Sequence, residues 1–212
     1  MNDIIKEASE YVRKTLKATK RTGMVDLLTH MDDIGFFTAA CSGGNHLCCD
    51  GGLVVHTANV MKLTDQLGPV LLGRVRYKTM RDSARIVAGL HDLGKCGQFG
   101  KSYYVPNMIK DGRPTKTNPE QKYKRSDAKP FCQNTDLLHV DHPIRSVVEA
   151  TQFIELTEEE QFAILYHDGL YGSLAYEIKG RERPLQTLLH FADYWSSQFD
   201  EGKNLPVEEE NT

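Results

Sequence analysis

Apolar residues recur at steps of three or four positions along most of this chain, and this period constrains the fold more than any other feature. In residues 4–16, the apolar side chains stand four apart, at Ile4, Ala8, Val12 and Leu16. Such spacing places them on one face of an amphipathic helix. The same period predicts helices over residues 24–34, 53–67, 79–93, 143–154, 158–167 and 184–199. We therefore expect an all-α domain with one shared core.

One long segment breaks this pattern. Residues 97–141 are rich in Pro, Gly, Lys and Tyr and show no sustained helical period. A stretch of that length in a compact domain is usually functional or disordered. Asp111-Gly112 lies between two runs of β-forming residues, which predicts a β-hairpin. We expect a single domain over residues 1–200 with this insert inside it, followed by an acidic, disordered tail over 201–212.

Composition narrows the class of protein. A chain of 212 residues that is 40% hydrophobic suits one domain with a real core. The five cysteines form no Cys-x-x-Cys pair, so reduced thiols are expected rather than a zinc knuckle. The first residues mix acids and bases, and no apolar run approaches the roughly 18 residues that span a bilayer. We expect a cytoplasmic protein without membrane segments, and the sequence does not predict its oligomeric state.

Histidine is the residue type that points to chemistry. The chain has eight histidines, and five of them fall inside or at the end of a predicted helix: His56, His91, His142, His167 and His190. Asp92 and Asp168 each follow one of these histidines directly, and Asp193 lies one helical turn after His190. Imidazoles and carboxylates that converge from rigid helices are what a metal site requires.

Three segments carry a resemblance to a known family. GGLVVHTANV (51–60), GLHDLGK (89–95) and LLHFADYW (188–195) resemble, in order and spacing, the successive motifs of the HD superfamily of metal-dependent phosphohydrolases. The motifs are similar to those of stand-alone phage and bacterial HD proteins and of the HD domain in the 3′→5′ exoribonuclease branch. The resemblance implies an HD-type helical bundle with a central divalent metal held by His56, His91, Asp92 and Asp193.

Two further segments are similar to extra histidine motifs of dinuclear HD members, which include the HD-GYP phosphodiesterases. They are DHPIRSVVEA (141–150) and AILYHDGLYGS (163–173). By this resemblance His142 and His167 bind a second metal, and Asp92 bridges the two ions. The alternative is that His142 caps a helix and His167 lines the cleft without a metal, and His139 competes with His142 as a ligand. A GYP signature is missing, which counts against a cyclic-di-GMP-specific enzyme.

Four residues near these motifs are candidates for other roles. Lys95 follows the His-Asp doublet, where it can hold a substrate phosphate or stabilise a helix C-terminus. His46 precedes the first motif and is expected to contact substrate or orient a ligand, unless it is an incidental loop residue. His190 is a candidate for orienting a ligand, contacting phosphate or packing. Asp168 is expected behind the ligands rather than among them.

The charge of the insert indicates what kind of substrate to expect. Residues 101–129 hold eight bases and three acids, a local charge of +5, so the rest of the chain sums to −8. Tyrosines are interleaved with these bases, and we expect Lys101 and Tyr103 to contact substrate. Cations beside aromatic rings favour an anionic substrate with stackable bases. A small nucleotide is the expected partner, single-stranded nucleic acid is a second candidate, and a merely solvated loop is the alternative.

These observations predict hydrolysis of a phosphoester or phosphoanhydride bond, most simply in a nucleotide. A divalent metal would lower the pKa of a bound water, giving the nucleophile, with Asp92 and Lys95 as catalytic residues. Mixed His and carboxylate ligands do not distinguish Mn, Fe, Mg, Ni and Zn. Two alternatives stay open: a nuclease or phosphodiesterase acting on single-stranded nucleic acid or a cyclic nucleotide, and a non-catalytic HD module that senses a nucleotide.

Overall fold

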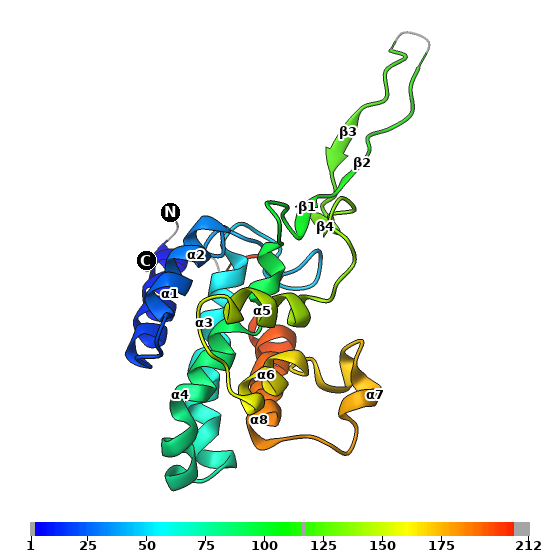
Figure 1. Ribbon diagram of the computed structural model, residues 1–212. Helices are drawn as coiled ribbons and strands as arrows, with labels where there is room; N and C mark the ends of the chain where they lie inside the picture. Colours follow the sequence, from blue (N-terminus) through cyan, green and yellow to red (C-terminus); the bar gives the residue numbers. More distant parts are fainter. Residues whose placement is uncertain (1–2, 116–117, 206–212) are drawn as a thin grey trace, which may run out of the picture.

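The computed structural model describes residues 3–115 and 118–205 and is 54% helical and 7% strand (Figure 1). Eight α-helices lie in this part of the chain: α1 (Asp3–Ala18), α2 (Met24–Asp33), α3 (Gly52–Leu71), α4 (Arg74–Leu90), α5 (His142–Thr151), α6 (Glu158–Leu165), α7 (Ala175–Ile178) and α8 (Pro184–Trp195). The mainly helical class is confirmed. None of the helices described is long and apolar enough to cross a bilayer.

Sequence signals close to the helix ends predicted most of these ends to within a few residues. Thr157 and Glu160 form a reciprocal capping box that starts α6, as the Thr-x-x-Glu spacing requires. Helix α3 runs to Leu71, past Pro69, although the sequence pattern ended it at residue 67. The last turn is held because Gly68 packs against the ring of Tyr77 from α4, where a Cβ atom would lie 2.1 Å from the ring.

Helix α3 is the centre of the core. Its residues Leu53, Val54, Val55 and His56 are consecutive, yet each is at most 5% exposed. A helical segment buried on all sides is surrounded by others, and α3, which is buried in this way over its first part, packs against α1, α4 and α8. A polar side chain on such a helix is held in place by its neighbours, which makes His56 a rigidly placed group.

A short 3₁₀ helix, η1 (Leu93–Cys96), brings the His-Asp doublet to the start of α5. Gly94 makes this close approach feasible, since a Cβ atom there would lie 2.2 Å from the carbonyl oxygen of His142. The hydroxyl of Ser146 fixes the junction: it accepts from the Gly94 amide at 2.8 Å and lies 2.7 Å from the His91 carbonyl. Two segments far apart in sequence are thereby locked together at the site.

The insert forms a hairpin built from two antiparallel pairs, as Figure 1 shows. Strand β1 (Tyr104–Pro106) pairs with β4 (Phe131–Gln133) at its base, and β2 (Met108–Lys110) pairs with β3 (Tyr123–Arg125) farther out. The predicted hairpin is confirmed, but not as a tight turn at Asp111-Gly112. Asp111 instead continues the ladder by donating to the Lys122 carbonyl at 2.9 Å, so the chain reverses beyond it.

The expected disordered tail over 201–212 is wrong in its first part. Residues 201–205 follow a π-helical turn, η3 (Ser196–Asp200), and dock on the domain. The amides of Leu47 and Cys48 donate to the carbonyls of Gly202 and Lys203 at 2.8 and 2.7 Å. Acidic composition suggested a solvated end, but these backbone bonds and a buried Glu201 hold the segment. Residues 206–212 lie outside the described residues.

Candidate metal centre

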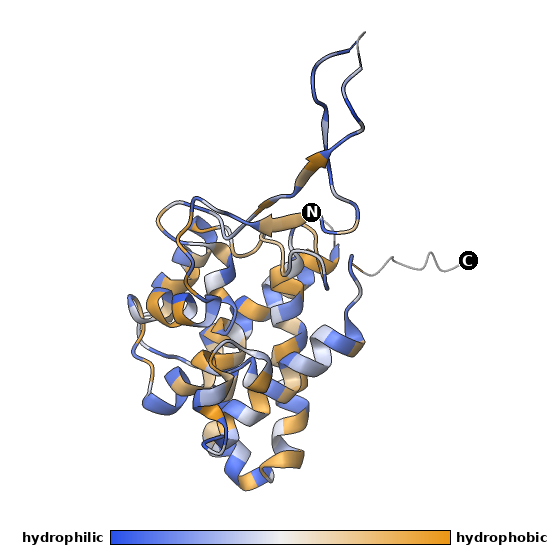
Figure 2. Cartoon of the chain, turned by 90° about the vertical axis from the view of Figure 1, so that its right-hand side faces the viewer, coloured by the Kyte–Doolittle hydropathy of each residue, from blue (hydrophilic) through white to orange (hydrophobic). Residues whose placement is uncertain are grey.

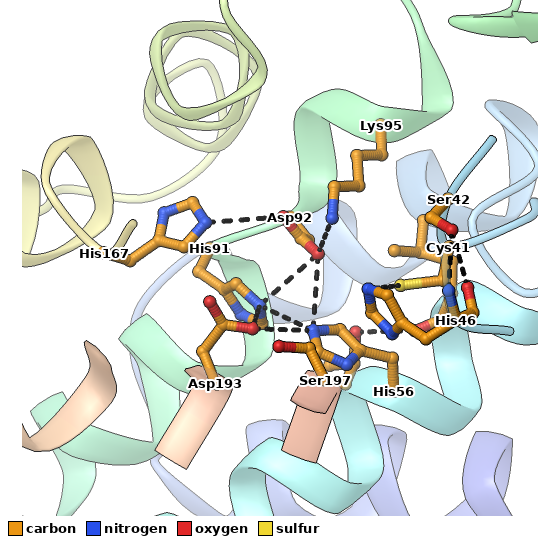
Figure 3. Close-up of polar contacts among 12 residues, drawn as sticks. Cys41, Ser42, His46, His56, His91, Asp92, Lys95, His167, Asp193 and Ser197 are labelled. Carbon is orange, nitrogen blue, oxygen red and sulfur yellow. Dashed lines mark hydrogen bonds and ion pairs between the residues drawn. The ribbon is translucent and has the colours of Figure 1, made fainter. Parts of the chain in front are cut away.

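Six predicted ligands from five segments converge on one point in the core. His56 comes from α3, His91 and Asp92 from the junction of α4 and η1, His142 from α5, His167 from the turn after α6 and Asp193 from α8. Figure 3 shows how most of these side chains face one another. His56, His91, Asp92 and His167 are each at most 1% exposed. Buried polar groups of this kind need partners or an ion.

The first ligand group consists of His56, His91, Asp92 through Oδ2, and Asp193. The Nε2 atom of His56 lies 3.3 Å from that of His91 and 3.1 Å from Asp193 Oδ1. Both Nε2 atoms lie 3.5 Å from Asp92 Oδ2. Metal–ligand bonds of about 2.1 Å place neighbouring donor atoms about 3.0 Å apart in an octahedron and about 3.4 Å in a tetrahedron. The observed separations therefore fit donors around one cation.

The second ligand group consists of Asp92 through Oδ1, His142, His167 and Asp168. Asp92 Oδ1 lies 3.1 Å from His142 Nε2 and 3.5 Å from His167 Nε2, and these two nitrogens are 3.3 Å apart. Asp168 adds oxygens at 3.8 and 3.6 Å from the two histidines. The two oxygens of Asp92 thus face opposite groups, as a bridging carboxylate would.

Asp92 Oδ1 is buried and forms no hydrogen bond within the described residues, although His142 lies at ion-pair distance. An orphaned carboxylate oxygen in a core is costly. A cation between Oδ1 and the two histidines would relieve that cost. The same position is where the second group would hold its ion.

Hydrogen bonds on the far side of two imidazoles direct their Nε2 atoms toward the centre. His91 Nδ1 lies 2.9 Å from the Ala88 carbonyl, and His167 Nδ1 lies 2.8 Å from the Ile164 carbonyl. Because a carbonyl only accepts, each Nδ1 carries the proton. The Nε2 atoms of His56 and His91, and those of His142 and His167, face each other at 3.3 Å, a separation that a shared proton or a metal cation between the two nitrogens stabilises.

The protonation states differ among the ligands. Burial lowers the pKa of His91 to about 4, so this imidazole is neutral at pH 7. Burial alone would also lower the pKa of His56 and His167, but neighbouring acidic groups raise it, well above the ordinary value for His56 and to about 9 for His167, so metal binding would release protons from these two imidazoles. Burial alone would raise the pKa of Asp92, but Lys95 and the surrounding histidines hold it well below its usual range. Neutral imidazole and ionised carboxylate are the ligand forms that divalent metals require. The groups are thus positioned to hold a metal ion, whose identity their mixed N and O donors do not fix.

Lys95 lies beside the bridging carboxylate. Its Nζ is 2.6 Å from Asp92 Oδ2. Burial alone would lower the pKa of Lys95, but the Asp92 carboxylate raises it well above the ordinary value, so the side chain remains a cation. Lys95 also lines a 220 Å³ cavity with Tyr103 and Tyr104 from the start of the insert. The base of the insert therefore reaches the metal centre through this lysine.

Glu201 is a member of the site that sequence reasoning missed. Its buried carboxylate accepts from His46 Nδ1 at 2.6 Å, from His56 Nδ1 at 2.9 Å and from Asn59 at 3.0 Å. His46 therefore lies behind His56, with its Nε2 4.0 Å from Cys41 Sγ. Burial raises the pKa of Cys41 to about 12, so it is a neutral thiol. Nothing local marks Glu201, because it follows the ligand it supports by 145 positions.

His190 and Asp168 lie next to the second ligand group. His190 Nδ1 lies 2.8 Å from the carbonyl oxygen of His167, so it fixes the turn that carries that ligand. Gly169, at φ +57°, makes room for the His190 ring, which a Cβ atom would approach to 2.7 Å. The carboxylate of Asp168 lies within ligand distance of its neighbours. The sequence predicted a position behind the ligands, so Asp168 lies closer to the centre than expected.

The structure separates Lys101 and His139 from this centre, whereas Tyr103 lies at the cavity beside Lys95. Lys101 is exposed, donates to the Asp136 carbonyl at 2.7 Å, and lines a distinct 470 Å³ cavity with His30. Tyr103 is buried, and its hydroxyl accepts from Gln133 at 2.9 Å. His139 has a side chain 79% exposed, and Asp141 is its one carboxylate neighbour in the part of the chain that the structure describes, so His142 is the histidine at the second group.

Comparisons with known proteins add no family to this description. Neither the protein-family models, nor the curated proteins, nor the solved structures gave a significant match to this chain.

Proposed function

We propose that this protein is a metal-dependent phosphohydrolase of the HD superfamily that cleaves a phosphoester or phosphoanhydride bond, in the first instance of a nucleotide. One observation carries the proposal: the buried carboxylate of Asp92 directs one oxygen to each of two groups of histidines and lies 2.6 Å from a lysine. A purely structural metal site is closed by its ligands and has no use for a buried cation beside it.

When bound, divalent metals would supply Lewis acidity and an activated water. The chain's own groups do the rest. Lys95 offers a positive charge to a phosphoryl oxygen, and Asp92 keeps that lysine charged and aimed at the centre. In the reaction a bond forms between the water oxygen and phosphorus, and the bond from phosphorus to the leaving oxygen breaks, with one water consumed. Asp193, His142 and Asp168 are the partly exposed members, so substrate would enter on their side.

The test is metal content together with turnover. Protein purified without chelators would be assayed for metal per chain and for hydrolysis of a panel of nucleoside mono- and triphosphates and of bis(p-nitrophenyl) phosphate, each with added Mn²⁺. We expect one retained metal per chain, a second that binds at saturating Mn²⁺, and turnover. Nucleotide binding without any turnover would contradict the proposal and favour a sensing module. Metal-free protein that stays inactive after Mn²⁺ addition would also contradict it.

A further inference from the structure

The outer part of the insert projects away from the helices, as Figure 1 shows. We name residues 108–125, excluding 116–117, the arm; just beyond it, the carbonyls of Asp127 and Ala128 accept from Lys203 of the C-terminal segment. Strands β2 and β3 contact each other, and their six residues are all exposed. An isolated two-stranded hairpin with both faces in water is only marginally stable. Its projection therefore gives no evident benefit to the core.

The register of the arm pairs apolar and cationic side chains. Lys110 faces Tyr123, Ile109 faces Lys124, and Met108 faces Arg125. Directly opposed residues share a face of the ladder, so each face presents a base beside an apolar group. Tyr123 is exposed and shares its face of the ladder with Lys110, directly opposite, and with Arg125, two positions along the strand. A ring for stacking next to cations for phosphates is the combination that binds single strands.

The lysine ammonium groups of the arm are available to bind an anion. Lys110 and Lys122 have no acidic partner within the described residues, and Lys124 has only a 3.9 Å contact with Asp111 in which both groups are half exposed. An exposed pair of that kind contributes little. Residues 101–129 carry +5 against −8 for the rest of the chain. Figure 2 shows the arm as largely hydrophilic. A polyanion would thus meet attraction at the arm and repulsion elsewhere.

The base of the arm leads to the metal centre. Phe131 of β4 packs with Ala40, Cys48 and Tyr104, which fixes the hairpin on the loop before α3. Tyr103 and Tyr104, at the start of β1, line one cavity with Lys95. A strand with one phosphate at Lys95 could therefore continue outward along the arm.

We propose that the arm binds single-stranded nucleic acid, so that the substrate of the centre is a polynucleotide strand rather than a free nucleotide. The choice of substrate rests on the proposed function, whereas binding by the arm does not. A second copy of this chain could also use an exposed hairpin, but it would not use the stacking ring beside Lys110 and Arg125 or the connection to Lys95.

The test uses the full chain and a fluorescein-labelled 20-nucleotide thymidine oligomer, with binding followed by fluorescence anisotropy in EDTA so that hydrolysis cannot contribute. The arm variant is Lys110→Glu/Lys122→Glu/Lys124→Glu. The control is Lys6→Glu/Lys14→Glu/Lys17→Glu, an equal charge change at exposed positions of α1. We expect the arm variant to weaken binding at least about tenfold and to reduce the slope of log K against log [salt] by about 2, at about 0.7 per lost phosphate contact. Tyr123→Ala should cost about 5- to 150-fold.

Several results would overturn the inference: no binding by the unaltered chain at low salt, equal weakening in both lysine variants, or tighter binding of a duplex of the same length. Loss of a dimer in the arm variant, with oligomer binding unchanged, would show that the arm joins copies of the chain. With metal added, the ratio of oligomer hydrolysis to bis(p-nitrophenyl) phosphate hydrolysis should fall about tenfold in the arm variant alone. Oligomer binding without hydrolysis of any substrate would contradict only the proposed function.

Discussion

The two ligand groups share Asp92 but differ in how firmly the protein holds them. In the first group, His56 and His91 are fully buried, and each has a hydrogen-bond partner on the nitrogen that faces away from the centre. In the second group, His142 is 17% exposed and its Nδ1 has no partner within the described residues, and Asp168 is 35% exposed. Only His167 is tied to a carbonyl there.

This difference indicates that the two metal positions of one centre can differ in how tightly they hold an ion. Partners behind metal-binding histidines fix ring orientation and raise ligand basicity. The first group should therefore bind its metal tightly, and the second should bind more weakly. The looser group also faces solvent, so under the proposed function a substrate would displace water or a weak ligand there. We expect the second position to fill only at higher metal concentration.

Asp92→Asn should have the largest effect because it changes the residue that both groups share. The amide keeps the size of the side chain but removes the charge that faces both groups of histidines and Lys95. We expect loss of both metals and a fall in turnover of at least about 100-fold. Metal analysis after gel filtration, with a thermal melt to check folding, measures this. Retention of one tightly bound metal would show that Asp92 does not bridge.

His56→Asn and His142→Asn should differ in a way that tests the asymmetry directly. His56→Asn removes a ligand of the tight group and should leave the chain without retained metal after dialysis. His142→Asn should retain one metal per chain and lose only the weaker equivalent, which Mn²⁺ titration would follow. Equal losses in the two variants would contradict the proposed difference between the groups.

Glu201→Gln should weaken the first group without touching a ligand. Gln keeps the size of the side chain but loses the charge that orients His46 and His56 together. We expect metal affinity at the tight position to fall about 10- to 100-fold. Competition with a chromogenic chelator would measure this, and Glu10→Gln on the exposed face of α1 is the matched control. Unchanged affinity would mean that Glu201 only anchors the C-terminal segment.

Sequence alone predicted the helices well because their signals are local. The capping box at Thr157 and the apolar spacing of α1 each depend on residues within one or two turns. The end of α3 depends instead on a ring from α4, and the hairpin turn depends on ladder bonds beyond Asp111. Those features follow from tertiary contacts, which periodicity does not report.

The same distinction holds at the site. His56, His91, Asp92, His142, His167 and Asp193 were predicted as ligands, and the structure brings all six together. Glu201 was missed because its carboxylate acts only through the fold, from a segment that composition marked as a tail. Lys101 was expected at the substrate, yet its amine is used on the Asp136 carbonyl. Residue type identified the ligands, but only packing could identify what lies behind them.

Asp168→Asn should have the smallest effect, and its size decides whether Asp168 is a ligand. Its oxygens lie 3.8 and 3.6 Å from His142 Nε2 and His167 Nε2, so it can bind the second ion or only add negative charge nearby. Because the side chain is 35% exposed, water can replace a lost oxygen. We therefore expect the Mn²⁺ affinity of the weaker position to fall by about tenfold or less, with two metals still bound at saturation. Calorimetric titration would measure this, and saturation at one metal would instead make Asp168 as necessary as His142.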